Sequence, residues 1–459
     1  MKFVTAKTPL AVAVGLLVAT SVWAKVPASE AEQLGKELTC VGAIKAGNKE
    51  GTIPEFTGKW LGAPAGVAHV QASGKHPVDI YAGEKPILVI TAENMDKYAD
   101  KLSDGQKAMF KKYPKTMQIP VYKGHRDFRY TDETCAILKK NALESEVAAD
   151  GLSIKGTFGA INFPIPKTGQ EVIWNNLLPT RAYTETIIRD MANVLSDGSM
   201  SFGRMGNRNL DMVNMPEKLG TPVEGPMAYS NTRGMLPERE KGGVTNSVEP
   251  TNFGKDKRLA WSYDPGTRRV RQVPEYGFDQ PMTGTGGKMT IDSDRLFNGS
   301  PERYNWKLLG KKEMYIPANN FKIHQATVKY ADLLKPGHAN PEFMRYELRR
   351  VWAVEGTLKE GFRHLYGKRV LFVDEDTGQA VAADMYDARG QLWQQALINY
   401  YYSFDIKAWH AGTSFYHDLN SGGYMGYNLF QERPLGPILN KGDLTPAMFT
   451  PEAARNAGN

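Results

Sequence analysis

The sequence predicts a mainly β protein whose helices are concentrated in the first third of the chain. Between residues 346 and 402, four β-prone runs alternate with short turns that contain Gly, which is typical of an antiparallel meander. The helix capping signals that we identify all lie before residue 180. With 459 residues, of which 41% are hydrophobic and 10% aromatic, the chain can bury a large core.

The first 24 residues have the pattern of an export signal. Lys2 and Lys7 precede an apolar stretch from Pro9 to Val22, and Val22-Trp-Ala24 fits the small-residue rule for cleavage. A membrane anchor is disfavoured because a spanning helix needs about 20 apolar residues and this stretch is shorter. We therefore expect residues 1–24 to be a signal peptide cleaved after Ala24, and the mature chain to act in the periplasm.

Charge and composition narrow the function classes. The formal net charge is +7, and loss of Lys2 and Lys7 with the signal peptide leaves 7 − 2 = +5. Nucleic-acid binding needs a concentrated basic face, which so mild a charge does not supply. We find no internal repeat or clear linker, and we expect an N-terminal helical and irregular segment over residues 25–165 that packs on a β domain over 166–459.

The chain has two cysteines, Cys40 and Cys135. An exported protein with one available pair usually uses it, so we expect a disulfide between these residues. The alternative is two free, buried thiols. A metal site is not expected, because two thiols alone do not complete the ligand shell of zinc.

Four segments of the N-terminal part are predicted to be helical. Each begins at a residue that can cap a helix, and three have the Glu or Gln partner of a capping box three residues later. The four starts are Ser29 with Glu32, Thr91, Ser103 with Gln106, and Thr168 with Glu171. The first helix is expected to run through Leu38, and the third to end before Pro114. The Gly- and Pro-rich stretches between them are expected to be irregular.

The remainder of the chain is expected to form strands. A hairpin is predicted over residues 258–273, because Asp264-Pro-Gly-Thr267 separates two β-prone runs and places Pro at the second turn position. The meander is predicted as strands over residues 346–358, 364–373, 379–386 and 391–402.

Two of the meander strands carry apolar side chains on both faces. Val370-Leu-Phe-Val373 does not alternate, and Val351 and Ala353 lie on the opposite face from Trp352 and Val354. A half-exposed antiparallel strand would alternate apolar and polar residues, so we expect both faces to be covered. An ordinary core and a cavity filled by an apolar ligand both fit this pattern.

Several motifs are shared with a known family of exported Gram-negative proteins. In the first half of the chain they include Leu38-Thr-Cys-Val-Gly-Ala43, Ala82-Gly-Glu-Lys-Pro86 and Tyr122-Lys-Gly-His-Arg126. The most specific are Tyr263-Asp-Pro-Gly-Thr-Arg-Arg-Val-Arg-Gln-Val-Pro274 and Tyr386-Asp-Ala-Arg-Gly-Gln-Leu-Trp393. Over nearly the whole mature chain, the sequence resembles a family of unknown function that is described as similar to outer-membrane lipoprotein-sorting proteins.

The resemblance implies a fold similar to that of the lipoprotein carriers LolA and LolB. That fold is an incomplete antiparallel β-barrel, curled around a hydrophobic cavity and plugged by helices. Residues 166–459 would then form the barrel with a C-terminal extension, wrapped by the irregular N-terminal segment. The resemblance also implies two partners, an outer-membrane barrel protein and a resistance-nodulation-division type exporter. It implies no catalytic residue, binding residue or cofactor.

Motifs of familiar chemistry are incomplete in this sequence. Gly284-Thr-Gly-Gly-Lys288 lacks the first Gly and the final Ser or Thr of a phosphate-binding loop. His410 and His417 lack the helical spacing of a metal-binding pair, and we expect them to be ordinary hydrogen-bonded or surface histidines. Arg268, Arg269 and Arg271 form a basic strand. It fits a solvated edge that blocks aggregation. It also fits a docking surface for an acidic partner or a lipid headgroup.

We therefore expect a periplasmic binding or carrier protein for a lipid-like or hydrophobic molecule, in transport to or from the outer membrane, and not an enzyme. The alternative is an adaptor subunit without cargo that links an inner-membrane exporter to an outer-membrane barrel protein. We expect no cofactor and no metal. Aromatic and aliphatic residues on the inner face of a curled sheet should point toward the cavity or the core. The six candidates are Trp261, Tyr263, Trp352, Val354, Phe372 and Trp393.

Overall fold

Most of the chain forms one large curled sheet in the structure, a computed structural model that describes residues 26–273, 277–282 and 284–458. We call its first part the meander half, in which each strand pairs with the next: β11 (Tyr304–Pro317), β12 (Tyr346–Leu358), β13 (Lys368–Asp374), β14 (Ala380–Tyr386), β15 (Leu392–Ser403), β16 (Ala408–Asp418) and β17 (Tyr424–Leu429). We call the second part the wall half: β5 (Thr184–Val194), β6 (Met200–Asp211), β7 (Pro226–Leu236), β8 (Val244–Pro250), β9 (Leu259–Asp264) and β10 (Arg269–Gln272).

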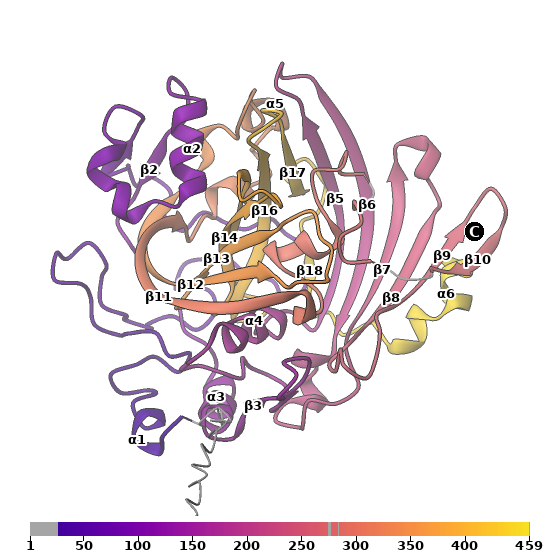
Figure 1. The fold of residues 1–459 in the computed structure, drawn as a ribbon, viewed down its shortest axis with the longest axis horizontal. Helices are drawn as coiled ribbons and strands as arrows, with labels where there is room; N and C mark the ends of the chain where they lie inside the picture. Colours follow the sequence, from indigo (N-terminus) through magenta and orange to yellow (C-terminus); the bar gives the residue numbers. More distant parts are fainter. Residues whose placement is uncertain (1–25, 274–276, 283, 459) are drawn as a thin grey trace, which may run out of the picture.

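The two halves join where β17 pairs antiparallel with β5. β11 and β10 lie at opposite ends of this strand order, and no pairing between them occurs among the described residues. The sheet is therefore curled but open, with the wall half at the right of Figure 1. This confirms the mainly β fold and the incomplete antiparallel barrel.

The predicted meander and hairpin are both confirmed. β12 pairs antiparallel with β13, β13 with β14, and β14 with β15. β9 and β10 form the hairpin, with Asp264 opposite Arg269. The observed strand ends differ from the predicted ones by a few residues, most at the start of β13, which begins at Lys368.

Two predicted helices begin at their predicted caps. α2 (Asp104–Lys112) follows Ser103 and α4 (Gly169–Leu177) follows Thr168, each with a complete capping box. α1 (Ala28–Ala31) is shorter than expected and has no side-chain cap. The segment after Thr91 forms a 3-10 helix, η1 (Met95–Lys101), and the sequence prediction missed α3 (Asp132–Glu144).

The remaining elements are short. They are β1 (Leu88–Ile90), β2 (Ile119–Val121), β3 (Glu146–Val147), β4 (Ile154–Lys155), β18 (Ile438–Leu439), α5 (Tyr330–Leu333), α6 (Pro451–Gly458), η2 (Met212–Asn214), η3 (Pro216–Lys218), η4 (Glu238–Glu240), η5 (Ile291–Leu296), η6 (Pro301–Arg303), η7 (Lys322–His324), η8 (Pro341–Phe343) and η9 (Pro446–Phe449). None of the helices in the described ranges is long and apolar enough to cross a membrane. The predicted signal peptide, residues 1–24, lies outside the described residues.

α4 is the helix that plugs the curl. It contacts β11 and β12, and its side chains are almost all buried. Asn176 accepts a 2.9 Å hydrogen bond from the backbone of Ala380 in β14 and donates one of 3.0 Å to the carbonyl oxygen of Phe297. The helix thus connects the meander half to the segment that precedes β11.

The N-terminal segment packs on the meander half. Phe128 and Ile137 belong to the same hydrophobic core as Leu371 of β13. Arg126 donates two hydrogen bonds, 2.9 and 2.8 Å long, to Asp376 in the turn after β13. Bidentate pairs of this kind fix geometry as well as adding energy, so this segment is held in one position on the sheet.

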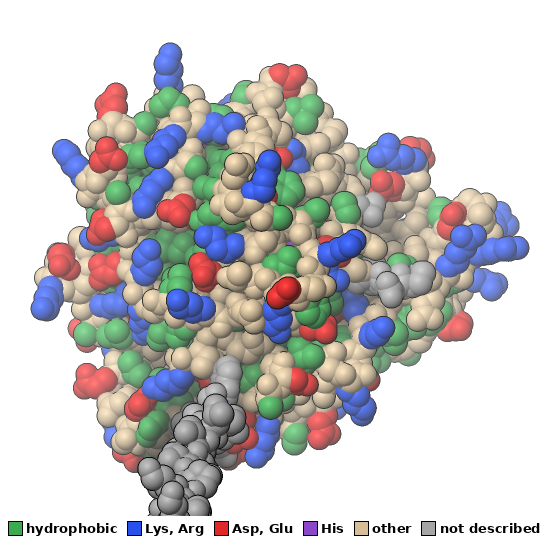
Figure 2. All heavy atoms as spheres, viewed as in Figure 1, with side chains coloured by type: hydrophobic (Ala, Val, Ile, Leu, Met, Phe, Trp, Pro, Cys, Tyr) green, Lys and Arg blue, Asp and Glu red, His purple; other side chains and the backbone are tan. Residues whose placement is uncertain are grey.

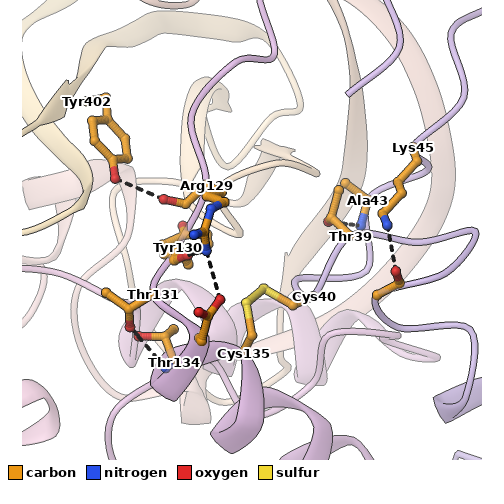
Figure 3. Close-up of a disulfide and its surroundings, with 12 residues drawn as sticks. Thr39, Cys40, Ala43, Lys45, Arg129, Tyr130, Thr131, Thr134, Cys135 and Tyr402 are labelled. Atoms are coloured by element: carbon orange, nitrogen blue, oxygen red, sulfur yellow. Dashed lines mark hydrogen bonds and ion pairs between the residues drawn. A yellow bond between two sulfur atoms is a disulfide. The ribbon is translucent and has the colours of Figure 1, made fainter. Parts of the chain in front are cut away.

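The disulfide lies within this segment. Cys40 and Cys135 are bonded and separated by 95 residues in sequence, and the bridge fastens the start of the segment to α3 (Figure 3). This confirms the predicted pair and excludes the alternative of two free thiols.

Candidate ligand-binding site

A cavity of about 510 Å³ lies between the wall half and the last strands of the meander half. Residues of strands β5 to β9 line one side of it. Figure 1 shows these strands side by side at the right of the molecule. Ile398 of β15, Trp409 of β16 and Tyr427 of β17 line the other side, and η5 and the residues around it add a third. Small-molecule sites usually have volumes of about 300–1,000 Å³, so the cavity has the size of a ligand site.

Two rows of side chains run across the wall half. The strand registers place four polar residues side by side in the first row, which is Glu185, Asn209, Ser230 and Ser247. The second row is Ile187, Asn207, Thr232, Thr245 and Ser262. Directly paired residues project to the same face of a sheet. All of these residues except Ile187 line the cavity, so the wall presents a polar face to it.

Charged side chains extend this polar face. Among the described lining residues are the acids Glu185, Asp211, Glu249 and Asp294 and the bases Arg181, Arg189, Arg258 and Arg295. Arg181 forms a close ion pair with Asp211, and Arg258 forms one with Glu249. Two of the four arginines are thus neutralised by a carboxylate within the wall.

Glu185, Arg189 and His410 form a connected group. The Glu185 carboxylate accepts a 2.9 Å hydrogen bond from Asn209 and lies 3.6 Å from Nε2 of His410. Arg189 Nε donates a 2.8 Å hydrogen bond to Asn207, and its guanidinium lies 5.4 Å from the centre of the Tyr427 ring. These contacts hold the two charged side chains against the wall.

Burial and charge shift the pKa values of this group. Burial by itself raises the pKa of Glu185, but His410, Arg189 and the hydrogen bond from Asn209 together lower it below its usual range. Burial lowers the pKa of His410 more than the attraction of Glu185 raises it. At neutral pH, Glu185 is therefore a carboxylate and His410 a neutral ring.

Arg295 differs from the other arginines of the cavity. It lines the cavity from η5, its Nε is buried without a hydrogen bond, and no described residue forms an ion pair with it. Its backbone is left-handed, with φ of 51° and ψ of 35°. This conformation costs a non-Gly residue on the order of 1–2 kcal/mol. Such strained positions cluster at functional sites, where the surrounding structure holds them in place.

Apolar side chains complete the lining. They come from both halves of the sheet and from the segment around η5: Met205, Met227, Met282, Ile291, Ile398, Trp409 and Tyr427. The cavity is therefore amphipathic: it has the apolar surface that the resemblance implies and, in addition, a polar wall. The physical reason is that cross-strand rows of Asn, Ser and Thr cover the inner face of the wall half.

Comparison with known proteins places the chain in a family. Residues 89–455 match the family described as a protein of unknown function, DUF1329. The chain belongs to this family. An uncharacterised protein of Pseudomonas aeruginosa is 39% identical over 445 residues, which are 96% of each chain. The resemblance recognised in the sequence is thus confirmed.

Solved structures show a weaker likeness to this DUF1329 protein. A domain named for outer-membrane lipoprotein sorting, from Vibrio parahaemolyticus, is 15% identical with a TM-score of 0.40, over 62% of this chain and 97% of that one. A DUF1329 family protein from Desulfovibrio piger is 14% identical with a TM-score of 0.40, over 60% and 92%. A LolA superfamily protein from Nitrosomonas europaea is 14% identical with a TM-score of 0.37, over 62% and 98%.

Trp261 and Tyr263, predicted to point inward, lie on the other face of the wall half. They alternate with Ser262, which lines the cavity, and successive side chains of a strand point to opposite faces. Tyr263 is buried there with Val244 and with Ala454 of α6. The apolar face of this hairpin is thus covered by the C-terminal helix and not by a ligand.

The other four candidates lie in the meander half, also away from the cavity lining. Val354 and Phe372 are buried in the main core, and Trp352 and Trp393 pack against it while half-buried. Helices and the N-terminal segment supply the apolar partners that a ligand was expected to supply. A role for these residues in ligand contact stays a prediction.

The sequence prediction did not identify β5 to β8, the four strands of the wall half that supply most of its cavity lining. β6 to β8 each carry two small polar residues two positions apart on the cavity face, and strand prediction rests on alternation of apolar with polar residues. The repeated pairs are Asn207 and Asn209 in β6, Ser230 and Thr232 in β7, and Thr245 and Ser247 in β8. That period of two, repeated in successive segments, is the signal that could have found the site.

The other motifs have separate surroundings. His410 lines the cavity, whereas His417 is buried elsewhere with Nδ1 2.9 Å from Oε1 of Gln395. No cluster of three metal-ligating side chains occurs in the part of the chain that the structure describes. Lys and Arg side chains gather over β9 and β10 at the right of Figure 2, where Arg268, Arg269 and Arg271 are exposed.

Proposed function

We propose that this DUF1329 protein is a periplasmic binding protein that carries one small amphipathic, lipid-like molecule to or from the outer membrane. The observation that carries the proposal is the cavity, whose volume fits one small ligand and whose lining joins a polar wall to an apolar surface. Small molecules usually bind in concave sites of this size, in which a few polar groups are placed among apolar side chains. The export signal predicted at residues 1–24 supports the periplasmic location.

Recovery of the bound molecule is the experiment that tests this function. The protein would be purified from the periplasm after expression of the whole precursor, extracted with organic solvent, and the extract examined by mass spectrometry. An amphipathic molecule in near-stoichiometric amount is the expected result. Absence of any such molecule, together with failure to bind a fluorescent amphiphile, would contradict the proposal.

A pair of variants ties binding to the cavity. Thr245→Trp places a large side chain in the second polar row and should reduce both recovery of the ligand and binding of the fluorescent amphiphile. Thr267→Trp introduces the same side chain in the exposed turn of the β9–β10 hairpin and should leave both unchanged. Equal effects of the two substitutions would show that the ligand binds elsewhere.

The second candidate function is a cargo-free adaptor between an inner-membrane exporter and an outer-membrane barrel protein. The exposed basic strand favours it, because Arg269 and Arg271 offer a surface to an acidic partner (Figure 2). If the protein is an adaptor, the Thr245→Trp variant should still support export in cells. A variant in which Arg269 and Arg271 are both changed to Glu should not. A carrier would show the reverse pattern.

A further inference from the structure

Among the described arginines that line the cavity, Arg295 is the one without an ion-pair or hydrogen-bond partner among the described residues. Its Nε is buried and makes no hydrogen bond, and it forms no ion pair within the described chain. A buried donor that stays unsatisfied is costly, and natural structures contain few of them. A bound group that accepts hydrogen bonds from Arg295 would remove this cost.

The other three arginines that line the cavity each have a partner among the described residues. Arg181 and Arg258 are paired with carboxylates, and Arg189 donates to Asn207 while lying over a tyrosine ring. Arg295 is thus the guanidinium with donors to spare. A guanidinium fork matches the geometry of carboxylate and phosphate oxygens, which it binds through two parallel hydrogen bonds.

The acidic residues of the cavity do not prevent an anionic group from binding, because most of them have partners within the protein. Asp211 and Glu249 form ion pairs with arginines. Glu185 accepts a hydrogen bond from Asn209 and lies close to His410. Asp294 precedes Arg295 in the chain but lies too far from it to form an ion pair. Burial raises the pKa of Asp294, partly offset by Arg189 and Arg181, so its charge repels an incoming anion less than a free carboxylate would.

We propose that the cavity selects amphiphiles with an anionic head group, and that the Arg295 guanidinium binds this group while the apolar tail lies against the Met, Ile and Trp side chains of the lining. This inference rests on the proposed carrier function and adds the chemical class of the ligand. The left-handed backbone of Arg295 supports it, because strain at a cavity-lining residue is retained where a function needs the side chain in that place.

Three ligands with one common tail test the head-group preference. Binding of dodecanoate, dodecyl phosphate and dodecan-1-ol to the mature protein would be measured by calorimetry, with acetate and inorganic phosphate as tail-free anions. At least one of the two anionic amphiphiles should bind on the order of 10- to 100-fold more tightly than the alcohol, which is the range expected for charge-assisted hydrogen bonds. The tail-free anions should bind far more weakly than either, because they lack the apolar contact.

Variants of Arg295 connect this preference to one side chain. Arg295→Gln should abolish the advantage of the anionic amphiphiles and leave the affinity for dodecan-1-ol unchanged, and Arg295→Lys should retain part of it. Arg268→Gln is the matched control, because Arg268 is also a left-handed arginine, with φ of 55°, but is exposed in the hairpin turn. It should change none of the affinities. Thermal unfolding of each variant verifies that it is folded.

The outcomes separate this inference from the function on which it rests. If the alcohol and the anionic amphiphiles bind with equal affinity, or if Arg295→Gln preserves the difference, the anionic-head inference is overturned while the carrier function stands. If no amphiphile binds at all, both are overturned. If acetate or phosphate binds as tightly as the amphiphiles, the site recognises a free anion, and the lipid-like class is wrong.

Discussion

The meander half and the wall half belong to one sheet, but their residues differ in burial and polarity. All seven residues of β14 are buried, whereas β6 has exposed or half-buried residues at most positions. In β14, Asp384 faces α2 through a 2.9 Å hydrogen bond from Gly105, while Ala383 and Met385 belong to the main core. Protein thus covers both faces of the meander, and an apolar sequence on both faces is the consequence.

In the wall half, the inner face packs against the main core only in part, at residues such as Ile187 and Met191. Its inner face borders the cavity with Asn, Ser and Thr side chains, and parts of its outer face are open to solvent, as the 44% exposed Ile188 shows. The comparison teaches that doubly apolar strands mark the protein's own core. The face that borders the cavity is instead marked by alternating small polar residues.

The largest expected effect concerns the cover of the meander half. Replacing both Cys40 and Cys135 by Ser should lower the free energy of unfolding by about 4–5 kcal/mol, because the bridge restrains a long loop in the unfolded chain and its cysteines are separated by 95 residues. Denaturant unfolding of the oxidised protein and of the double variant measures this.

The same variant should bind a fluorescent amphiphile normally under conditions where it is folded, because the disulfide lies in the N-terminal segment and not in the wall half. Reduction of the native protein should reproduce the loss of stability. Loss of binding by the folded variant would mean that the N-terminal segment also shapes the cavity. The wall half would then not form the site independently of the segment that packs on the meander half.

One substitution, Arg to Met, should have opposite effects in the meander half and in the cavity lining. Arg349 is buried in the meander half with Nη2 2.9 Å from Asp376 and 3.4 Å from Asp374. Arg349→Met leaves these carboxylates buried and should cost about 3–5 kcal/mol. Arg295→Met removes a cation whose buried Nε has no hydrogen bond from the η5 side of the cavity and should stabilise the ligand-free protein by about 1 kcal/mol.

Urea unfolding of the ligand-free proteins measures both changes as shifts in midpoint. Arg268→Met in the exposed turn is the control and should stay within about 0.5 kcal/mol of the native value. If Arg295→Met destabilises the protein as Arg349→Met does, then Arg295 has a structural role and the proposed difference is lost.

The last comparison is a pair of opposite pH dependences of stability. Burial raises the pKa of Asp384 in the meander half from 3.8 to about 7. The folded state then binds the proton more strongly than the unfolded state, so this carboxyl makes stability fall as pH rises through that interval. The slope is at most about 1.4 kcal/mol per pH unit, and Asp384→Asn should remove it.

Glu185 on the wall should act in the other direction. Its pKa is lowered below 4.5, so it contributes stability above the unfolded value that is lost as pH falls through the folded value. Glu185→Gln should therefore reduce the loss of stability in acid. Thermal unfolding between pH 3 and pH 8 measures both variants, and slopes of the same sign would contradict the assignment.

The sequence by itself determined the features that depend on neighbouring residues. The capping boxes at Ser103 and Thr168 predicted α2 and α4, because a helix start is set within four residues. The Pro-Gly turn predicted the β9–β10 hairpin for the same local reason. α3 was missed although Thr131 caps it, as its burial depends on contacts with distant segments.

Only the tertiary structure decided where the cavity lies. The cavity exists because β17 pairs with β5, more than two hundred residues earlier in the chain, and brings the wall opposite β15 and β16. The strand registers then decided that Ser262 faces the cavity and Tyr263 faces α6, and a shift of one residue would reverse them. The apolar residues chosen from the sequence could not reveal this, because burial against protein and burial against a ligand select the same side chains.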